Sequence, residues 1–133
     1  MTPVDRVVTA VEGLIESFAR SRSAIDLAGR LDGDVSAVES GGWVVDIPDG
    51  PLARLVVDDW TSASVAVLVI ELRDREIDVG ALRAGLALEE FQPLPGGVAS
   101  RGSEATVNGV VMTVGLLSGH DRAHRLSLTR FEP

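Results

Sequence analysis

The sequence lacks three side chains that carry much of the covalent chemistry of enzymes. Its 133 residues include no lysine, no tyrosine and no cysteine, so all 12 basic residues are arginine. Without lysine the chain can form no Schiff base and offers no P-loop lysine. Without cysteine it has no thiol nucleophile, no disulfide framework and no thiolate zinc site. These absences exclude several classes of enzyme.

Aromatic residues and histidine are scarce, and acidic residues outnumber basic ones. Aromatic residues make up 4% of the chain, histidine occurs only at His120 and His124, and the formal net charge is −8. Two histidines cannot build a three-histidine zinc site. Nucleic acid is bound by basic patches that release counterions, and single strands stack on aromatic side chains. We therefore expect no cofactor, no metal and no nucleic-acid partner.

Long apolar runs are missing as well. The chain begins Met1-Thr2-Pro3-Val4-Asp5, with an acid where a secretory signal carries positive charge, and no apolar stretch of about 7–15 residues follows. The longest apolar run, Val65 to Ile70, is far shorter than the roughly 20 residues that cross a bilayer. We expect a cytoplasmic protein with no membrane partner.

What remains is an ordinary globular mixture, with 45% hydrophobic and 24% charged residues. A chain of 133 residues has the usual size of one domain and buries about two-thirds of its unfolded surface. It shows no internal repeat and no linker. We predict a single domain over residues 1–133.

The clearest helical pattern covers residues 3–22. Thr2 can cap this helix and Pro3 suits its first position. Apolar residues then recur at spacings of three and four from Val4 to Phe18, with charged residues on the other face. The pattern predicts an amphipathic helix whose apolar stripe must be covered.

A second helix is expected at residues 79–90, capped by Asp78. Gly80 and Gly85 each weaken a helix by about 1 kcal/mol relative to alanine, so they indicate close packing. The small and polar residues 96–103 that follow are typical of a flexible connector.

The remaining segments have the alternation of strands. The run at 65–70 is continuously apolar and β-branched, which predicts a central strand covered on both faces. Asn108-Gly109 indicates a hairpin turn, and Gly41-Gly42 a kink or bulge. Strands are expected at 24–31, from the turn at Asp34 to Ile47 with the Gly41-Gly42 kink in its middle, and at 52–58, 65–70, 104–117 (the hairpin) and 123–131. The fold class is therefore α+β, a largely antiparallel sheet of five to seven strands packed with an N-terminal helix and one internal helix.

No set of side chains has the spacing of a catalytic or metal site. His120 and His124 would share one face of a helix, but Gly119 and the pattern that follows indicate a turn leading into a strand. Acid pairs such as Asp58-Asp59 occur at turns, where neighbouring carboxylates stay solvated, and there is no Gly-x-Ser-x-Gly elbow. We interpret these residues as capping and turn-forming, and we predict no catalytic residue.

Five residues remain as interface or pocket candidates. Trp60 stands beside a turn, so we expect it to be exposed and to act as an interface anchor. Arg101 lies in the polar connector, where it can contact an acidic group of a partner. In a pocket between sheet and helix, Met112 would line the wall and His124, Arg54 or Arg130 would supply the convergent polar group.

The element order resembles that of bacterial secretion chaperones. That family combines a helix, three antiparallel strands, a helix and two strands in a small acidic domain, and the segments 3–22, 43–72, 79–90 and 104–131 follow this order. The chain departs from the pattern by its additional segment at 24–31 and by lacking the closing helix. The resemblance implies a homodimer that shields a segment of a partner protein.

Two hypotheses for the function follow from these observations. The first is a non-catalytic protein-binding or self-associating module, with a protein partner or a second copy as its occupant. The alternative is a small-molecule-binding protein or enzyme with a pocket between curved sheet and helix. The shortage of chemically reactive side chains favours the first.

The helical stripe gives a prediction for stability. Leu14→Ala should lower the free energy of unfolding by roughly 2–5 kcal/mol, because truncating a core side chain leaves a cavity. His120→Ala should leave it nearly unchanged if that histidine lies in a solvated turn. Chemical denaturation of the two variants measures the difference. A large loss of stability in His120→Ala would contradict the interpretation of the histidine pair.

Overall fold

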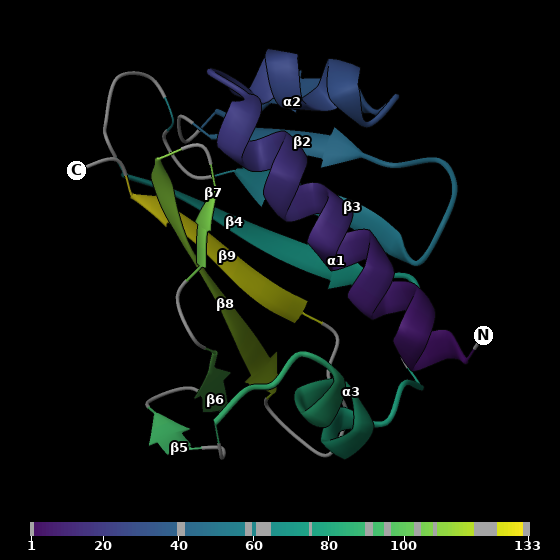
Figure 1. Ribbon diagram of the computed structural model, residues 1–133. Coiled ribbons are helices and arrows are strands. Elements are labelled where there is room, and N and C mark those ends of the chain that lie inside the picture. The colour runs from purple at the N-terminus through teal and green to yellow at the C-terminus, as the bar shows by residue number, and fades with distance from the viewer. Residues whose placement is uncertain are drawn as a thin grey trace.

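The computed structural model describes residues 2–39, 42–57, 60, 65–74, 76–89, 92–94, 97–102, 105–107, 109–118 and 125–131. Three helices and nine strands lie in this part of the chain (Figure 1). In chain order they are α1 (Pro3–Arg20), α2 (Ala24–Arg30), β1 (Asp34–Ala37), β2 (Trp43–Asp46), β3 (Leu52–Val57), β4 (Val65–Leu72), α3 (Val79–Gly85), β5 (Gln92–Leu94), β6 (Gly97–Arg101), β7 (Ala105–Val107), β8 (Val110–Ser118) and β9 (Arg125–Phe131).

The nine strands form one antiparallel sheet. Its order is β1-β2-β3-β4-β9-β8-β6-β5, and β7 pairs with β8 beside this path. Seven of the strands have four or more residues, and β5 and β7 have three each. The α+β class and the antiparallel sheet predicted from the sequence are thus confirmed, with β4 and β9 at the centre.

α1 begins and packs as its sequence predicts. Thr2 and Asp5 form a capping box, in which the hydroxyl of Thr2 accepts from the backbone N–H of Asp5 at 3.1 Å. The hydrogen bonds of the Asp5 carboxylate with the Thr2 side chain and backbone keep the pKa of Asp5 below its ordinary value. Val7, Val11 and Leu14 are buried against the sheet at helical spacing. Figure 1 shows α1 crossing one face of the sheet, which we call the inner face.

The segment at 24–31, predicted to be a strand, forms a helix instead. The hydroxyl of Ser23 accepts from the backbone N–H of Asp26 at 3.1 Å and thereby caps α2. Asp26 also pairs with Arg30 one turn later, at 3.4 Å. Ala24, Leu27 and Ala28 are buried, which is a helical and not an alternating spacing. The capping serine and the small residues therefore outweigh the alternation, and the domain has an additional helix.

Two later expectations also differ from the structure. α3 ends at Gly85, earlier than expected, because Ala87 takes a positive φ of 55° that a helix cannot continue. The stretch 96–103, expected to be a connector, contains β6, which pairs with β8.

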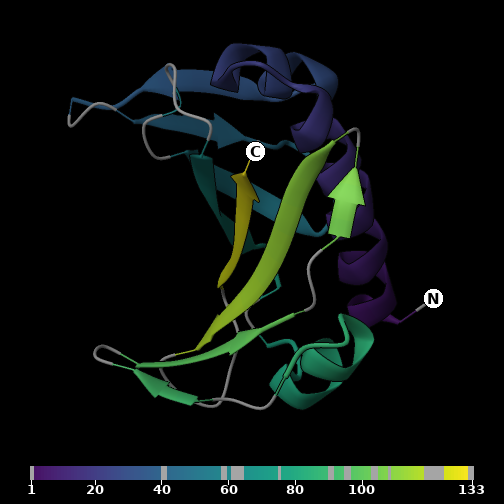
Figure 2. The ribbon, with the colours of Figure 1, turned by 60° about the vertical axis from the view of Figure 1, so that its left-hand side comes forward.

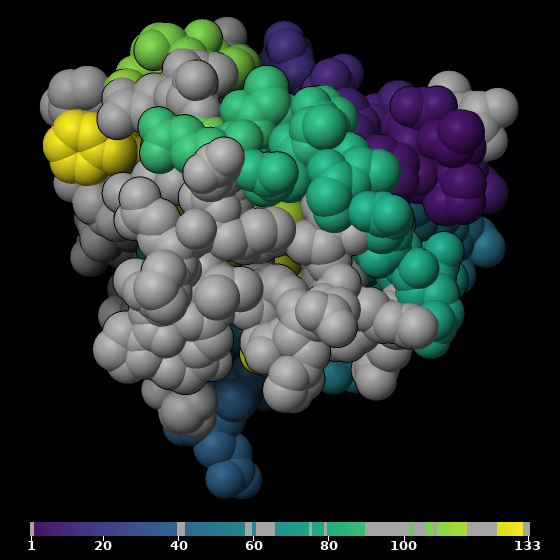
Figure 3. All heavy atoms as spheres, turned by 90° about the horizontal axis from the view of Figure 1, so that it is seen from below, coloured from purple at the N-terminus to yellow at the C-terminus, as the bar shows by residue number. Residues whose placement is uncertain are grey.

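The expectation of close packing at the glycines of α3 is met at one of them. A Cβ on Gly85 would lie 3.0 Å from a methyl group of Val8 and 3.4 Å from one of Val4, so α3 approaches the first turns of α1 closely. Figure 3 shows α3 in teal-green beside the purple start of α1. A Cβ on Gly80 would meet only the capping carboxylate of Asp78, at 3.3 Å.

The approach of Gly42 to its neighbour strand gives a second prediction. A Cβ on Gly42 would lie 2.7 Å from the backbone oxygen of Val57, so Gly42→Ala should cost roughly 1–3 kcal/mol by forcing β2 and β3 apart. Gly13→Ala is the matched control, because Gly13 lies in α1 with nothing within 4 Å of the added methyl. It should raise stability by about 0.5–1 kcal/mol. Urea melts compare the two, and equal effects would refute the close approach.

Candidate functional site

The face of the sheet opposite α1, here called the outer face, is rich in valine, threonine and small residues. Successive side chains of a strand point to opposite faces. On β4, Ala66, Leu68 and Ile70 are buried on the inner face, whereas Val67 and Val69 on the outer face remain partly exposed. The apolar run of β4 predicts a strand covered on both faces. In the structure, β4 is fully buried on only one face.

Strand register aligns these side chains into rows. One row runs from Val44 through Val56, Val69 and Ser127 to Gly115, and crosses five strands. The neighbouring row joins Val67 to Thr129 and Thr113. Thr113, Gly115, Ser127 and Thr129 surround a small hollow of about 160 Å³. From β2 to β8 the rows are uncharged and only partly exposed, and Arg101 of β6 is the next residue in register after Gly115.

One border of the outer face is charged. In register it consists of Asp34, Asp46, Arg54, Glu71 and Arg125, one residue on each of five adjacent strands. The Arg54 guanidinium lies 3.1 Å from the Asp46 carboxylate and 3.8 Å from that of Glu71. The candidate Arg54 thus belongs to an exposed ion-pair row, which we call the charged border. A hollow of about 380 Å³ lies along it.

The sheet is curved around its outer face. Figure 2 shows the β1–β2 end and the β5–β6 end of the sheet extending to the side opposite α1, with β4 and β9 between them. The outer face therefore lies between two projecting ends of the sheet.

Trp60 lies in the core, so the expectation of an exposed interface anchor is wrong. Only 7% of its surface is exposed. Its ring meets that of Phe18 edge to face, with centroids 5.0 Å apart and planes at 87°. The position of Trp60 next to a turn suggested that it is exposed. Its indole ring is buried instead, because it packs against the ring of Phe18 and the guanidinium of Arg130.

Arg130, the second candidate, is a buried arginine that joins the sheet to the end of α1. Its guanidinium donates to the carbonyl oxygen of Phe18 at 2.8 Å and to that of Ser21 at 2.7 Å. It also lies 5.5 Å from the ring centroid of Phe18 and 5.2 Å from that of Trp60. A cation at the C-terminus of a helix is stabilised by the helix dipole and by the last carbonyls. The geometry gives Arg130 a structural role.

Of the other candidates, Arg101 of β6 is in register with Gly115 and therefore stands at the end of the first row. His120 and His124 lie outside the described residues. Met112, expected to line a pocket, is buried in the core with 1% of its surface exposed.

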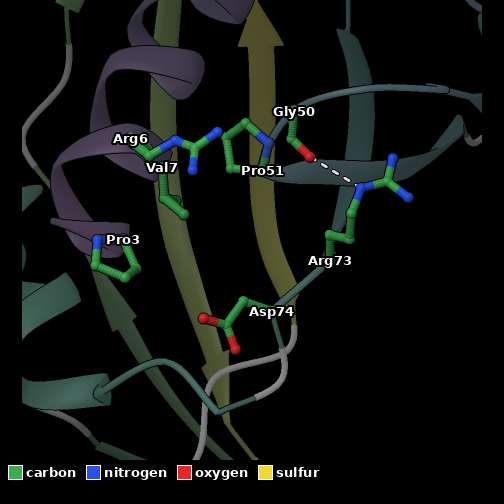
Figure 4. A pocket seen from close by; sticks show the side chains of 7 residues that line it. All are labelled: Pro3, Arg6, Val7, Gly50, Pro51, Arg73 and Asp74. Carbon is green, nitrogen blue, oxygen red and sulfur yellow. Dashed lines mark hydrogen bonds between the residues drawn. The ribbon is translucent and has the colours of Figure 1, made fainter. Parts of the chain in front are cut away.

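A hollow of about 440 Å³ lies between α1 and the turn before β3 (Figure 4). Arg73 lines it, but its guanidinium donates to the backbone oxygens of Gly50, Ile47 and Leu52, and so holds the β2–β3 turn. The carboxylate of Asp74 accepts from the backbone N–H of Glu76 at 2.9 Å. In the sequence, Arg73 belongs to a mixed-charge turn that indicates a solvated face or one edge of a polar interface rim, so its role in holding the β2–β3 turn was missed. Its partners are carbonyls more than 20 residues away, which no local pattern reveals.

The described part of the chain contains neither a cluster of metal ligands nor a helix able to span a membrane. No group of three or more histidine, aspartate and glutamate side chains there is placed to hold a metal ion. In the same part of the chain, no helix combines the length and apolarity needed to cross a membrane.

Comparison of the chain with protein-family models, with curated proteins and with solved structures gives no match.

The burial of Arg130 leads to a testable prediction. Arg130→Met should lower the free energy of unfolding by roughly 3 kcal/mol, because buried carbonyls lose a charged donor. Arg54→Ala is the control, since an exposed ion pair contributes at most about 1 kcal/mol. Guanidinium denaturation of both variants measures the contrast. If Arg130→Met were as mild as Arg54→Ala, the proposed link between sheet and helix would be wrong.

Proposed function

We propose that this chain is a non-catalytic protein-binding module that holds a segment of another protein against the outer face of its sheet. The observation that carries the proposal is the one-sided burial of β4. Its run of β-branched residues has the composition of a strand covered on both faces, yet Val67 and Val69 remain partly exposed. A bound partner segment would complete the cover.

The surroundings of these valines support a protein partner. The uncharged rows extend over five strands, and the charged border limits them on one side. An apolar centre beside a polar rim is the usual anatomy of a protein interface.

A pocket enzyme is the less well supported alternative. The hollow at the start of α1 lies between helix and sheet, as that hypothesis requires. Two of the described polar residues that line it, however, already form hydrogen bonds within the chain. Arg73 donates to backbone oxygens and Asp74 accepts from a backbone N–H. The third, Arg6, lies at an exposed position. A lining of this kind offers no nucleophile and base in contact.

The proposal is tested by a photo-cross-linking amino acid placed at position 67, followed by reconstitution with the purified partner. We expect a cross-link to a second protein, and a 1:1 complex of the two purified proteins by size exclusion with light scattering. Val69→Lys should weaken that complex about tenfold or more, because it places a charge in the apolar row.

Thr9→Lys is the matched control, because it adds the same charge on the exposed side of α1. It should leave the affinity unchanged, and thermal melts should show both variants folded. The proposal is overturned if position 67 yields no adduct, if it yields only a second copy of this chain, or if the two lysine variants bind equally well.

A further inference from the structure

We propose that the free edge of β1 binds an extended, arginine- or lysine-bearing segment of the partner as an additional antiparallel strand. The inference rests on the proposed protein-binding function and names the chemistry of the segment. Three features of the described residues carry it: the position of β1, the direction of its backbone groups, and the order of charges along the charged border.

β1 ends the sheet and is accessible. It pairs with β2 on one side, and the described sheet has no strand on its other side. Asp34, Ser36 and Ala37 are exposed, and the following Val38 is an exposed large hydrophobic residue with 38% of its surface accessible. An edge strand of this kind is a template for pairing with another chain.

Two residues of β1 direct their backbone N–H and C=O groups away from β2. Backbone groups of successive residues alternate in direction along an antiparallel strand. The N–H of Val38 donates to the oxygen of Gly42 at 2.8 Å, so the groups of Val38 face the β2 side. Those of Ala37 and Val35 therefore point away from β2, toward the position of an added strand.

The charged border specifies the sign of the partner. From β9 to β2 its charges alternate, with Arg125, Glu71, Arg54 and Asp46 in register. The alternation fails at the edge, where Asp34 stands directly opposite Asp46. Asp46 is paired with Arg54, and Asp34 has no ion pair within the described part of the chain. A cationic side chain on an added strand would restore the alternation, since opposite charges across strands are stabilising and like charges are not.

A second copy of this chain is a poorer occupant of the edge. Antiparallel pairing of β1 with itself would bring Asp34 and the nearby Glu39 of each copy to the same short interface. Each chain also carries a net charge of −8. A basic segment of another protein meets the edge without this repulsion.

The experiment uses two fluorescent heptapeptides, Thr-Arg-Val-Arg-Val-Arg-Thr and the same sequence with glutamate at each arginine. Anisotropy titrations with the full chain should show the arginine peptide binding at least about tenfold more tightly, and weakening with salt. Asp34→Arg should reduce this preference, because it reverses the charge that the partner strand meets. Equal affinities for the two peptides, or a preference unmoved by Asp34→Arg, would overturn the inference.

Backbone pairing is tested separately at Ala37. Ala37→Pro removes an outward N–H that β2 does not use, and proline is tolerated at such edge positions. It should abolish binding of the arginine peptide, while Ala37→Thr, which keeps the N–H, should not. Amide hydrogen exchange should show Val35 and Ala37 protected by the peptide in the unmodified chain. Undiminished binding to a folded Ala37→Pro variant contradicts strand addition.

These results are independent of the cross-linking at position 67. If a partner binds there and responds to Val69→Lys but not to Ala37→Pro, the protein-binding function stands and the edge site is wrong. If neither peptide nor partner binds, the function itself fails.

Discussion

The contact on which the rest of the structure depends is that of Arg130 with the end of α1. α1 is the longest helix described, and its apolar stripe can cover the inner face only if its end is fixed against the sheet. Arg130 lies on β9, more than 100 positions further along the chain. It fixes the end of α1 by donating to the carbonyl oxygens of Phe18 and Ser21. The hydroxyl of Ser21 donates a hydrogen bond to the backbone carbonyl oxygen of Ser17 at 2.7 Å. The carbonyl oxygens at these positions of the helix end therefore all accept hydrogen bonds. Buried carbonyl oxygens without a donor would destabilise the surrounding core.

This use of the inner face determines what is left for function. The rings of Phe18 and Trp60 and the guanidinium of Arg130 contact one another in the core, so these three groups are not available at the surface. The outer face presents valines and threonines between the projecting ends of the sheet, together with the exposed Phe131 of β9. Such a surface is poorly suited to bind a small polar ligand, because such a ligand needs a few convergent polar groups in an enclosed space. It suits a chain segment, whose backbone and side chains can extend over several strands.

The sequence predicts the fold where one local signal dominates, and misleads where two compete. The capping residue and the stripe of α1, the apolar run of β4 and the turn at Gly109, with its φ of 80°, all specify their elements without help from distant residues. At 24–30 alternation competes with a serine cap and small buried residues, and the helix prevails because Leu27 and Ala28 find the core on one side. The site is harder to predict, because Trp60 and Arg73 acquire their roles from partners far away in sequence. The charged border is likewise invisible until register places one residue of each strand beside the next.

The end of that border shows how a binding edge can be encoded at modest cost to the free protein. An exposed strand that paired with any chain would be an aggregation hazard, and proteins commonly protect such edges with charge. Asp34 is placed to do so here, because it stands in register with Asp46 at the edge of the sheet, where a second acidic copy would meet like charge. In the proposed complex, the same carboxylate would attract a strand with a cationic residue in register. In this proposal the unpaired charge of Asp34 has two effects. It repels an acidic strand, and it forms an ion pair with a cationic one.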